Sequence, residues 1–345
     1  PLKNKKTITF LINSLQVGGS EKVCITLCNE LSNLDYHVNL IVINPNTPLE
    51  KMVHKKVNLY KLGYEKIYLS FFKVVRFCGT LNTKSLIVFD PELYVFAHIS
   101  KILFRRKFNL IFRCYNTLSK SFNYYKSNRH NYINKPLIKF FLKISSRIVA
   151  QSTGMKKDLV QNFNVIEKNI TIIPNPSLVL NNSKCKTKKE DIILFVGRIA
   201  PQKGLEFLIR IMESVLNRFP NYKLLILGEG DIDYENKIKK LVKNTGLVDK
   251  IIFEGIKHNT SEYYQKAKMT VLTSLFEGFP NVLVESISFG TPVVSFNCES
   301  GVSDIIIDGI NGYLIPIFDI EQFIDSVEKL IKNPLDENRI IKTSC

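Results

Sequence analysis

Two charged clusters hold the side chains best suited to chemistry. The first, FVGRIAPQKG, places Arg198 and Lys203 in a glycine-containing connection that follows an apolar run. The second, within residues 274–316, places Glu277 and Glu285 around a Gly-Phe-Pro-Asn turn. Two cations can neutralise a diphosphate, and carboxylates accept hydrogen bonds from sugar and ribose hydroxyls. The residue types therefore predict a nucleotide-sugar site.

The two cations are expected to act on the leaving group. A nucleotide diphosphate gains negative charge as the glycosidic bond breaks, and fixed cations stabilise that charge without reorganising water. Taken alone, Arg198 and Lys203 would equally suit an exposed helix start. The carboxylate cluster further along the chain favours the binding role.

The carboxylates are expected on either side of a helix start. Asn281 is predicted to cap a helix that reads VLVESISFG, which puts Glu285 one turn inside the helix and Glu277 in the loop before it. Glu285 would bond the ribose, and Glu277 would hold sugar hydroxyls or offset positive charge at the reacting carbon. A loop glutamate and a helix glutamate are also common without any function. The backbone at the helix start is predicted to bind an anion, over Gly278, Phe279, Pro280, Asn281 and Val282.

A glycine pair follows the first apolar run. In LQVGGSE, Gly18 and Gly19 would let backbone N–H groups approach a phosphate or a sugar, although the entry turn of a helix uses glycines too. The spacing is not the G-x-G-x-x-G fingerprint of dinucleotide-binding proteins, which disfavours a dehydrogenase.

Composition limits the kind of protein that carries these clusters. With 345 residues, of which 45% are hydrophobic and 23% charged, the chain is expected to be soluble and globular and to form two domains. No apolar run approaches the roughly 18–20 residues that cross a bilayer. The seven cysteines include no C-x-x-C pair, so we expect small core residues in a reducing cytoplasm.

Strand-like and helix-like segments alternate along both halves. This alternation predicts two α/β domains, each a doubly wound parallel sheet of the Rossmann type, which face each other across a cleft. The polar segment NNSKCKTKKED is the best linker. We therefore expect an acceptor-binding domain over 1–178, a linker over 179–190, a nucleotide-sugar domain over 191–330 and a C-terminal segment over 331–345.

Charge is distributed unevenly between the halves. Residues 1–187 carry 29 Lys and Arg against 9 Asp and Glu, a net charge of +20, whereas residues 188–345 carry 19 against 22, a net charge of −3. Residues 101–150 contain twelve basic residues and no acidic one, interleaved with aromatics. This pattern favours contact with an anionic membrane surface. A solvated basic face is the plain alternative, and no nucleic-acid motif accompanies the charge, so nucleic acid is not an expected partner.

Taken together, these segments resemble the retaining glycosyltransferases of family 4, which have the two-domain GT-B fold. The resemblance covers nearly the whole chain, and its motifs occur in the family's order. They are VGGSE, the pair Asn175–Pro176, GRIAPQKG, LGEG at 227–230, FEG at 253–255, EGFPNVLVE, GTPVV and DGINGYLIP.

The resemblance implies roles for the clusters. The family's E-x7-E motif falls on Glu277 and Glu285, and its diphosphate-binding Arg and Lys fall on Arg198 and Lys203. It also implies that the second half binds the donor, with the base and ribose near Gly255, Ile256 and Lys257, and that the first half binds the acceptor. No metal and no cofactor are implied, and the leaving phosphate itself takes the acceptor's proton.

The chain departs from the family pattern at two places. Where many members carry a His, the strand ending in LIFRCYN is expected to place Tyr115, followed by Asn116, which can still hydrogen-bond a sugar or the acceptor. Members also finish with a longer helix that crosses back to the first domain. We therefore expect either a short crossover helix or a truncated one in residues 331–345.

The sequence thus predicts a cytoplasmic glycosyltransferase, peripheral on the inner face of the membrane. It would move a hexose or an N-acetylhexosamine from a nucleotide diphosphate sugar, with UDP the first choice, to a lipid-linked or oligosaccharide acceptor in bacterial surface polysaccharide synthesis. The alternative is a non-catalytic basic module, binding membrane or nucleic acid, that keeps a degenerate sugar site.

Overall fold

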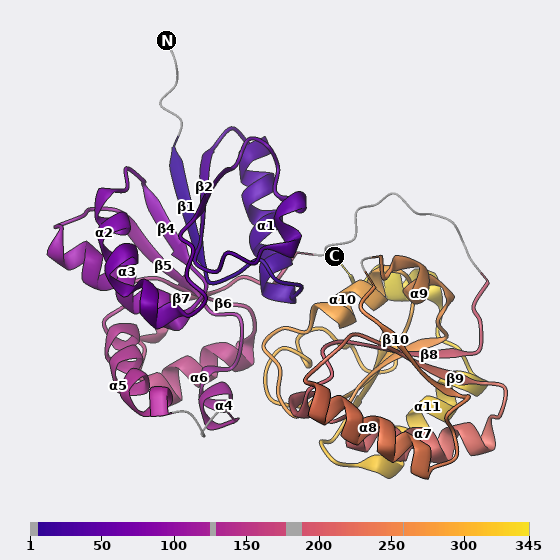
Figure 1. The fold of residues 1–345 in the computed structure, drawn as a ribbon. Helices are drawn as coiled ribbons and strands as arrows, with labels where there is room; N and C mark the ends of the chain where they lie inside the picture. The colour runs from indigo at the N-terminus through magenta and orange to yellow at the C-terminus, as the bar shows by residue number, and fades with distance from the viewer. Residues whose placement is uncertain (1–5, 125–128, 177–187, 258, 345) are drawn as a thin grey trace. The chain divides into compact units, whose positions relative to one another are not determined.

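The computed structural model describes residues 6–124, 129–176, 188–257 and 259–344. Its contacts divide the chain into two compact units, 1–176 and 177–345 (Figure 1). The predicted linker at 179–190 lies outside the described residues up to 187. Each unit has its own sheet and its own hydrophobic core.

The first unit holds a seven-stranded parallel sheet in the order β3-β2-β1-β4-β5-β6-β7. The chain leaves β1 toward β2 and β3 and resumes on the other side of β1 at β4. The switch in strand order, where open α/β sheets bind ligands, therefore lies between the carboxyl ends of β1 and β4. The strands are β1 (Thr7–Ile12), β2 (His37–Val42), β3 (Asn58–Lys61), β4 (Ser85–Val88), β5 (Asn109–Arg113), β6 (Ile148–Ala150) and β7 (Ile170–Ile172).

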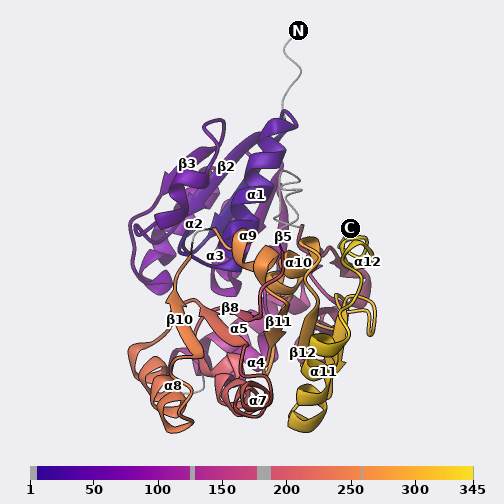
Figure 2. The same ribbon diagram turned by 90° about the vertical axis from the view of Figure 1, so that its right-hand side faces the viewer.

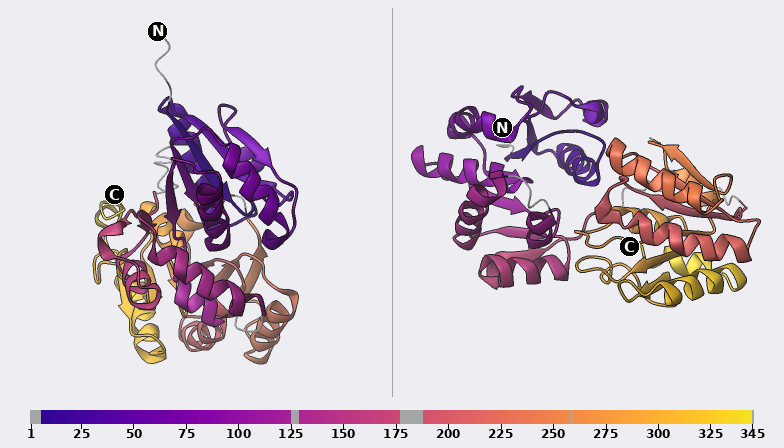
Figure 3. Two further views of the ribbon diagram at one scale, coloured as in Figure 1. Left: turned by 90° about the vertical axis from the view of Figure 1, so that its left-hand side faces the viewer. Right: turned by 60° about the horizontal axis from the view of Figure 1, so that its bottom comes forward.

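Helices cover both faces of this sheet, because alternate residues of each strand point to opposite sides. In β1, Phe10 and Ile12 join the core under α1, and Leu11 joins the core on the opposite side, under α2, α3, α5 and α6 (Figures 1 and 3). The helices are α1 (Gly19–Asn33), α2 (Phe71–Thr80), α3 (Pro91–Leu103), α4 (Leu118–Tyr124), α5 (Arg129–Lys143) and α6 (Thr153–Phe163), with 3-10 turns η1 (Pro48–Met52), η2 (Ile67–Ser70) and η3 (Glu167–Asn169).

The second unit holds a six-stranded parallel sheet in the order β10-β9-β8-β11-β12-β13. Strand order switches here between β8 and β11, as it does between β1 and β4 in the first unit. The strands are β8 (Ile192–Val196), β9 (Lys223–Leu227), β10 (Ile251–Gly255), β11 (Met269–Leu272), β12 (Val293–Phe296) and β13 (Gly312–Ile315).

The second sheet is also covered on both faces. Helices α7, α8 and α11 lie on one side, and α9 and α10 lie on the other (Figure 2). The helical spacing of apolar residues explains how α7 packs on the sheet. Its buried face is one fully buried stripe of Leu208, Ile209, Met212, Val215 and Leu216. The helices are α7 (Leu205–Arg218), α8 (Ile232–Asn244), α9 (Ser261–Lys266), α10 (Asn281–Ser288), α11 (Ile320–Lys332) and α12 (Glu337–Ile341), with the 3-10 turn η4 (Pro201–Lys203).

The predicted pair of doubly wound parallel sheets is therefore confirmed. The contacts divide the chain after Pro176, and α11 continues to Lys332, past the expected limit at 330. Helix α12 packs on α10 through the fully buried Ile340. Among the described helices, none is both long and apolar enough to cross a membrane.

A close backbone approach fixes the segment that carries Arg198. The N–H of Gly197 donates to Leu227 O at 2.9 Å, and the N–H of Ile199 donates to Glu229 O at 2.9 Å. A Cβ on Gly230 would lie 1.8 Å from the backbone oxygen of Ile199, which explains why glycine is needed at this position. The loop after β8 is thus held against the loop after β9.

We expect Gly230→Ala to lower the free energy of unfolding by about 3 kcal/mol, the upper end of the usual cost of overpacking, because the obstructing atom belongs to the backbone. Gly246→Ala is the matched control. A Cβ there would meet nothing within 4 Å, and only the left-handed backbone at φ 73° is penalised, by about 1 kcal/mol. Urea unfolding of both variants measures the difference. Equal losses would contradict the close approach.

Candidate active site

The connections after β8 and β11 are joined at the switch point of the second sheet. The Gln202 side chain donates to Phe276 O at 2.8 Å, and the N–H of Leu275 donates to Gln202 O at 2.8 Å. The hydroxyl of Thr273 donates to the backbone oxygens of Lys203 and Gly204 at 3.0 and 3.1 Å. These bonds place the loop that carries Lys203 beside the loop that carries Glu277.

Lys203 and Glu277 form an ion pair between these loops. The distance from Nζ to Oε1 is 2.5 Å, and the Ser274 hydroxyl donates to the same Oε1 at 2.6 Å. The two side chains are only 16% and 8% exposed. The structure thus brings together one predicted phosphate-binding cation and one predicted sugar-binding carboxylate.

Removing two charges from water costs several kcal/mol per ion, and a good contact recovers this cost without a large net gain. The Lys203–Glu277 pair is therefore weak evidence for stability. It is good evidence for positioning, because the carboxylate holds an ammonium group at the carboxyl edge of the sheet, where ligands of such folds bind.

The start of α10 corrects one expectation. Asn281 was predicted to cap the helix, but the capping position is Pro280, which makes no side-chain cap bond, and Asn281 is the first helical residue. Proline suits helix entry because its φ is fixed near the helical value. The preceding loop is anchored elsewhere: Ser300 Oγ and the N–H of Gly301 both donate to Gly278 O at 2.9 Å.

The rest of the predicted anion-binding segment lies at this helix start. Gly278 is buried, Phe279 and Val282 are half-buried, and Val282 is in the first turn of α10. The first N–H groups of any α-helix have no partner within the helix. The position therefore suits an anion.

Glu285 lies half-buried on α10 and has a partner that the sequence did not reveal. The hydroxyl of Tyr264, on α9, donates to Glu285 Oε2 at 3.0 Å. Tyr264 is fully buried, and burial followed by the charge of Glu285 raises its pKa well above the ordinary value. The tyrosine therefore stays protonated and orients the carboxylate. No local motif marks Tyr264, because the contact joins two helices.

The residues expected near the base follow β10. The N–H of Gly228 donates to Gly255 O at 2.8 Å, which ties this strand end to β9, and Ile256 is 43% exposed. Lys257 pairs with Glu254 at 2.9 Å, and that bond raises the pKa of Lys257. An exposed apolar side chain at a strand end suits the face of a base.

Arg198 stands apart from the other predicted cation. It follows β8, it is exposed, and no hydrogen bond or ion pair joins it to another described residue. The structure therefore places Arg198 at the same edge of the sheet as Lys203.

The predicted acceptor residues belong to the first unit. Gly18 is the capping residue of α1 and Gly19 its first helical residue. Tyr115 and Asn116 follow β5, and Asn116 Oδ1 accepts from the N–H of Thr117 at 2.9 Å. These four residues thus lie at strand ends or at a helix start, as predicted from the sequence.

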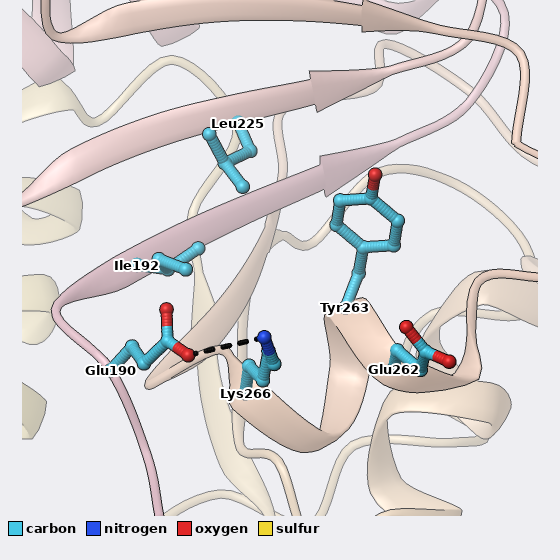
Figure 4. Close-up of a pocket in the computed structure, with 6 residues that line it drawn as sticks. All are labelled: Glu190, Ile192, Leu225, Glu262, Tyr263 and Lys266. Carbon is cyan, nitrogen blue, oxygen red and sulfur yellow. Dashed lines mark ion pairs between the residues drawn. The ribbon is translucent and has the colours of Figure 1, made fainter.

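A hollow of about 260 Å³ opens beside α9. Figure 4 shows Ile192 and Leu225 from two strands, Glu262 and Tyr263 from α9, and the ion pair of Lys266 with Glu190 at 3.4 Å. No predicted site residue lines it. The polar contacts at the switch point, rather than this hollow, therefore mark the candidate active site.

Comparison with known proteins decides the family. Residues 17–176 match the model for Glycosyltransferase Family 4, and residues 180–344 match the model for Glycosyl transferases group 1. An uncharacterised glycosyltransferase of Haemophilus influenzae is 30% identical over 336 residues, which cover 96% of this chain and 91% of that protein. The chain belongs to glycosyltransferase family 4.

Other members of the family are similarly related. An N-acetylgalactosaminyltransferase of Campylobacter jejuni that acts on a diphospho-undecaprenol compound is 29% identical over 346 residues, 96% of this chain and 91% of that protein. Among solved structures, Anabaena HepE in complex with UDP-glucose has a TM-score of 0.78 at 17% identity and covers 98% of this chain and 92% of its own. The apo galactosyltransferase WaaB has a TM-score of 0.74 at 20% identity. These structures confirm the GT-B fold.

Among the described residues, no group of three or more His, Cys, Asp or Glu is arranged to hold a metal ion. The groups at the switch point of this family 4 chain are the ammonium of Lys203, the carboxylates of Glu277 and Glu285, and the start of α10.

Breaking the Lys203–Glu277 pair should cost more stability than removing both charges. Lys203→Met is expected to lower the free energy of unfolding by about 3–5 kcal/mol, because Glu277 stays buried without its cation. The double variant Lys203→Met/Glu277→Gln should recover most of this loss. Urea unfolding compares the unmodified chain with the single and the double variant. Lys239→Met, which breaks the more exposed pair with Glu235, is the control, and its free energy of unfolding should change far less. A double variant as unstable as Lys203→Met would refute the coupling.

Proposed function

We propose that this glycosyltransferase is retaining, needs neither metal nor cofactor, and moves a hexose or an N-acetylhexosamine from a UDP-sugar. The acceptor is a lipid-linked or oligosaccharide glycan of bacterial surface polysaccharide synthesis. The observation that carries the proposal is the buried Lys203–Glu277 pair at the switch point, beside the start of α10.

Different residues of the second unit bind different parts of the donor. As the bond from the sugar C1 to the diphosphate oxygen breaks, Lys203 and Arg198 balance the charge that develops on the leaving group. Glu285, oriented by Tyr264, accepts hydrogen bonds from the ribose hydroxyls. The acceptor oxygen bonds to C1 on the face that the diphosphate leaves, and the proton of the acceptor goes to the leaving phosphate.

Relatives support the choice of substrates. HepE binds UDP-glucose, and a TarM structure contains UDP, which supports a UDP-linked donor here. The Campylobacter relative acts on a diphospho-undecaprenol compound, and a shorter match, over 53% of this chain, is with the lipopolysaccharide 1,6-galactosyltransferase of Escherichia coli. Both names support a glycan acceptor on a lipid.

A thermal-shift panel of nucleotide sugars tests the donor site. At about a hundred times its dissociation constant the correct donor should add roughly 2.7 kcal/mol of stability, with EDTA present or absent. Lys203→Ala should abolish the shift, because its cation contacts the diphosphate, whereas Lys239→Ala should keep it. The proposal would be refuted if no nucleotide sugar shifted the melting temperature while the chain bound DNA or RNA with steep salt dependence.

The same proposal includes contact with the inner face of the cytoplasmic membrane through residues 101–150. Residues 124–134 fall partly or wholly outside the described side chains. In and directly after the described part of α5, Leu137, Phe140 and Ile144 are 43%, 56% and 47% exposed and are flanked by the exposed bases Lys143 and Arg147. Exposed apolar groups next to bases suit the interface of an anionic bilayer.

Two further helices of the first unit also expose apolar side chains. The end of α3 exposes Leu103 and Phe104, followed by Arg105. Helix α2, which packs on α3, exposes Phe72 to 83%, although it precedes the predicted range. Each basic residue near an anionic surface contributes on the order of 1 kcal/mol of binding free energy. The first unit thus offers both basic residues for electrostatic attraction and exposed apolar side chains for insertion.

Vesicle sedimentation tests the membrane contact. We expect the chain to bind vesicles that contain phosphatidylglycerol and not pure phosphatidylcholine vesicles, and to dissociate as salt rises. Phe140→Ser with Ile144→Ser should weaken binding at least tenfold. Ile232→Ser, which changes a side chain 75% exposed on the acidic half, is the matched control. Equal binding by both variants would argue against this surface.

A further inference from the structure

The switch point of the first sheet holds a second polar bond between strand ends. Asn13 directly follows β1, and Asp90 follows β4 across the switch. The N–H of Asn13 donates to Asp90 Oδ2 at 2.7 Å. These positions correspond to those of Lys203 and Glu277, which follow β8 and β11 in the second unit.

The side chain of Asp90 does not cap helix α3, although Asp90 occupies the capping position. It is the capping residue of α3, where an aspartate side chain usually accepts an N–H of the first turn, but it makes no such bond. Ser152, Asp231, Asp319 and Asp336 all make that bond at their own helices. The Asp90 carboxylate is only 8% exposed and faces the end of β1 instead.

A second observation at the same place is an unsatisfied acceptor. Asn13 Oδ1 is buried and has no hydrogen-bond partner. Buried polar atoms without a partner are rare and cost about 1–3 kcal/mol, so a group that completes this one is expected at the site. A hydroxyl group, which donates one hydrogen bond, has the required chemistry.

The charges that shift the pKa of Asp90 are acidic. Burial raises the pKa of Asp90 to about 7, the bond from Asn13 opposes this rise, and the charges of Glu92 and Glu21 add to it. Tyr115 lies within reach of the same three carboxylates, and burial together with their charges raises its pKa. The thiol of Cys24, on α1, also faces this cluster. The buried cation Arg113 ends the neighbouring strand β5, where its Nη2 donates to Asn175 Oδ1 at 2.9 Å, and it does not shift the pKa of Asp90 or Tyr115.

This chemistry selects the ligand. A phosphate would be repelled by the carboxylates of α1 and α3. Among the described residues these carboxylates are not arranged to hold a metal ion either. A neutral ligand that donates hydrogen bonds fits both the ionised Asp90 and the unpartnered Asn13 Oδ1, and a sugar ring carries several such donors.

We propose that Asp90 and Asn13 bind hydroxyl groups of the acceptor sugar, with the Asp90 carboxylate accepting a hydrogen bond from one hydroxyl and Asn13 Oδ1 from a neighbouring one. This inference rests on the proposed function, since it names residues that bind the acceptor.

Binding of octyl glycosides to the full chain tests the assignment. Octyl glucoside, galactoside and the two N-acetylhexosaminides are titrated by saturation-transfer NMR at pH 8 with UDP present. At least one should bind, and Asp90→Asn should raise its dissociation constant at least tenfold. Glu30→Gln, which removes an exposed carboxylate from α1, should leave it unchanged. Failure of all four glycosides to bind the unmodified chain, or equal binding by Asp90→Asn, would overturn the inference.

The pH dependence of the unmodified chain gives a test that needs no variant. Asp90 accepts hydrogen bonds in its ionised form, which is lost as pH falls through about 7. Glycoside affinity should therefore fall about five- to tenfold from pH 8 to pH 6. A flat profile would overturn the assignment. UDP-sugar binding, measured in parallel, separates this outcome from failure of the proposed function, because the donor residues lie in the other unit.

Discussion

The buried pair of Lys203 and Glu277 is the constraint on which the second unit depends. Neither charge is tolerated alone at 16% and 8% exposure, so the loops after β8 and β11 must hold them at contact distance. The hydrogen bonds of Gln202 and Thr273 serve this requirement, since they fix the backbone on both sides of the pair. In the proposed function, the diphosphate would meet a cation already oriented, which would leave little reorganisation for the reaction itself.

Both units join the loops at their switch point by a polar bond, but the bonded groups differ. Both sheets change strand order between their first and fourth strands, and in both a polar bond joins the loops that follow those strands. In the second unit the bond includes a cation, which suits an anionic ligand. In the first unit it joins a backbone N–H to a carboxylate, among further carboxylates, which suits neutral hydroxyls. In the proposed function, this difference in chemistry would separate donor from acceptor.

The sequence predicts best what local pattern determines. The buried stripe of α7 and the alternation of strands with helices are periodic, so fold and element order follow from them. Lys203 and Glu277 can be predicted as site residues because they lie in two short motifs. The Tyr264 contact and the Asn13–Asp90 bond were not found, because they join positions 21 and 77 residues apart and no local signal marks either partner. The cap at Pro280 was missed since Asn is the more usual capping residue.

Charge acts in the first unit at two ranges, over the exposed surface and between buried groups at the switch point. The net charge of +20 in residues 1–187 acts across roughly the Debye length of 8–10 Å, and in the proposed function it favours an anionic surface. At the switch point, burial reduces the screening, and the charges that shift the pKa of Asp90 are those of carboxylates, whereas the nearby cation Arg113 bonds to Asn175. A lipid-linked sugar presents anionic phosphates on one side and neutral hydroxyls on the other. In the proposed function, the basic exterior would stabilise the phosphates of such a ligand, and Asp90 would bind its hydroxyl groups.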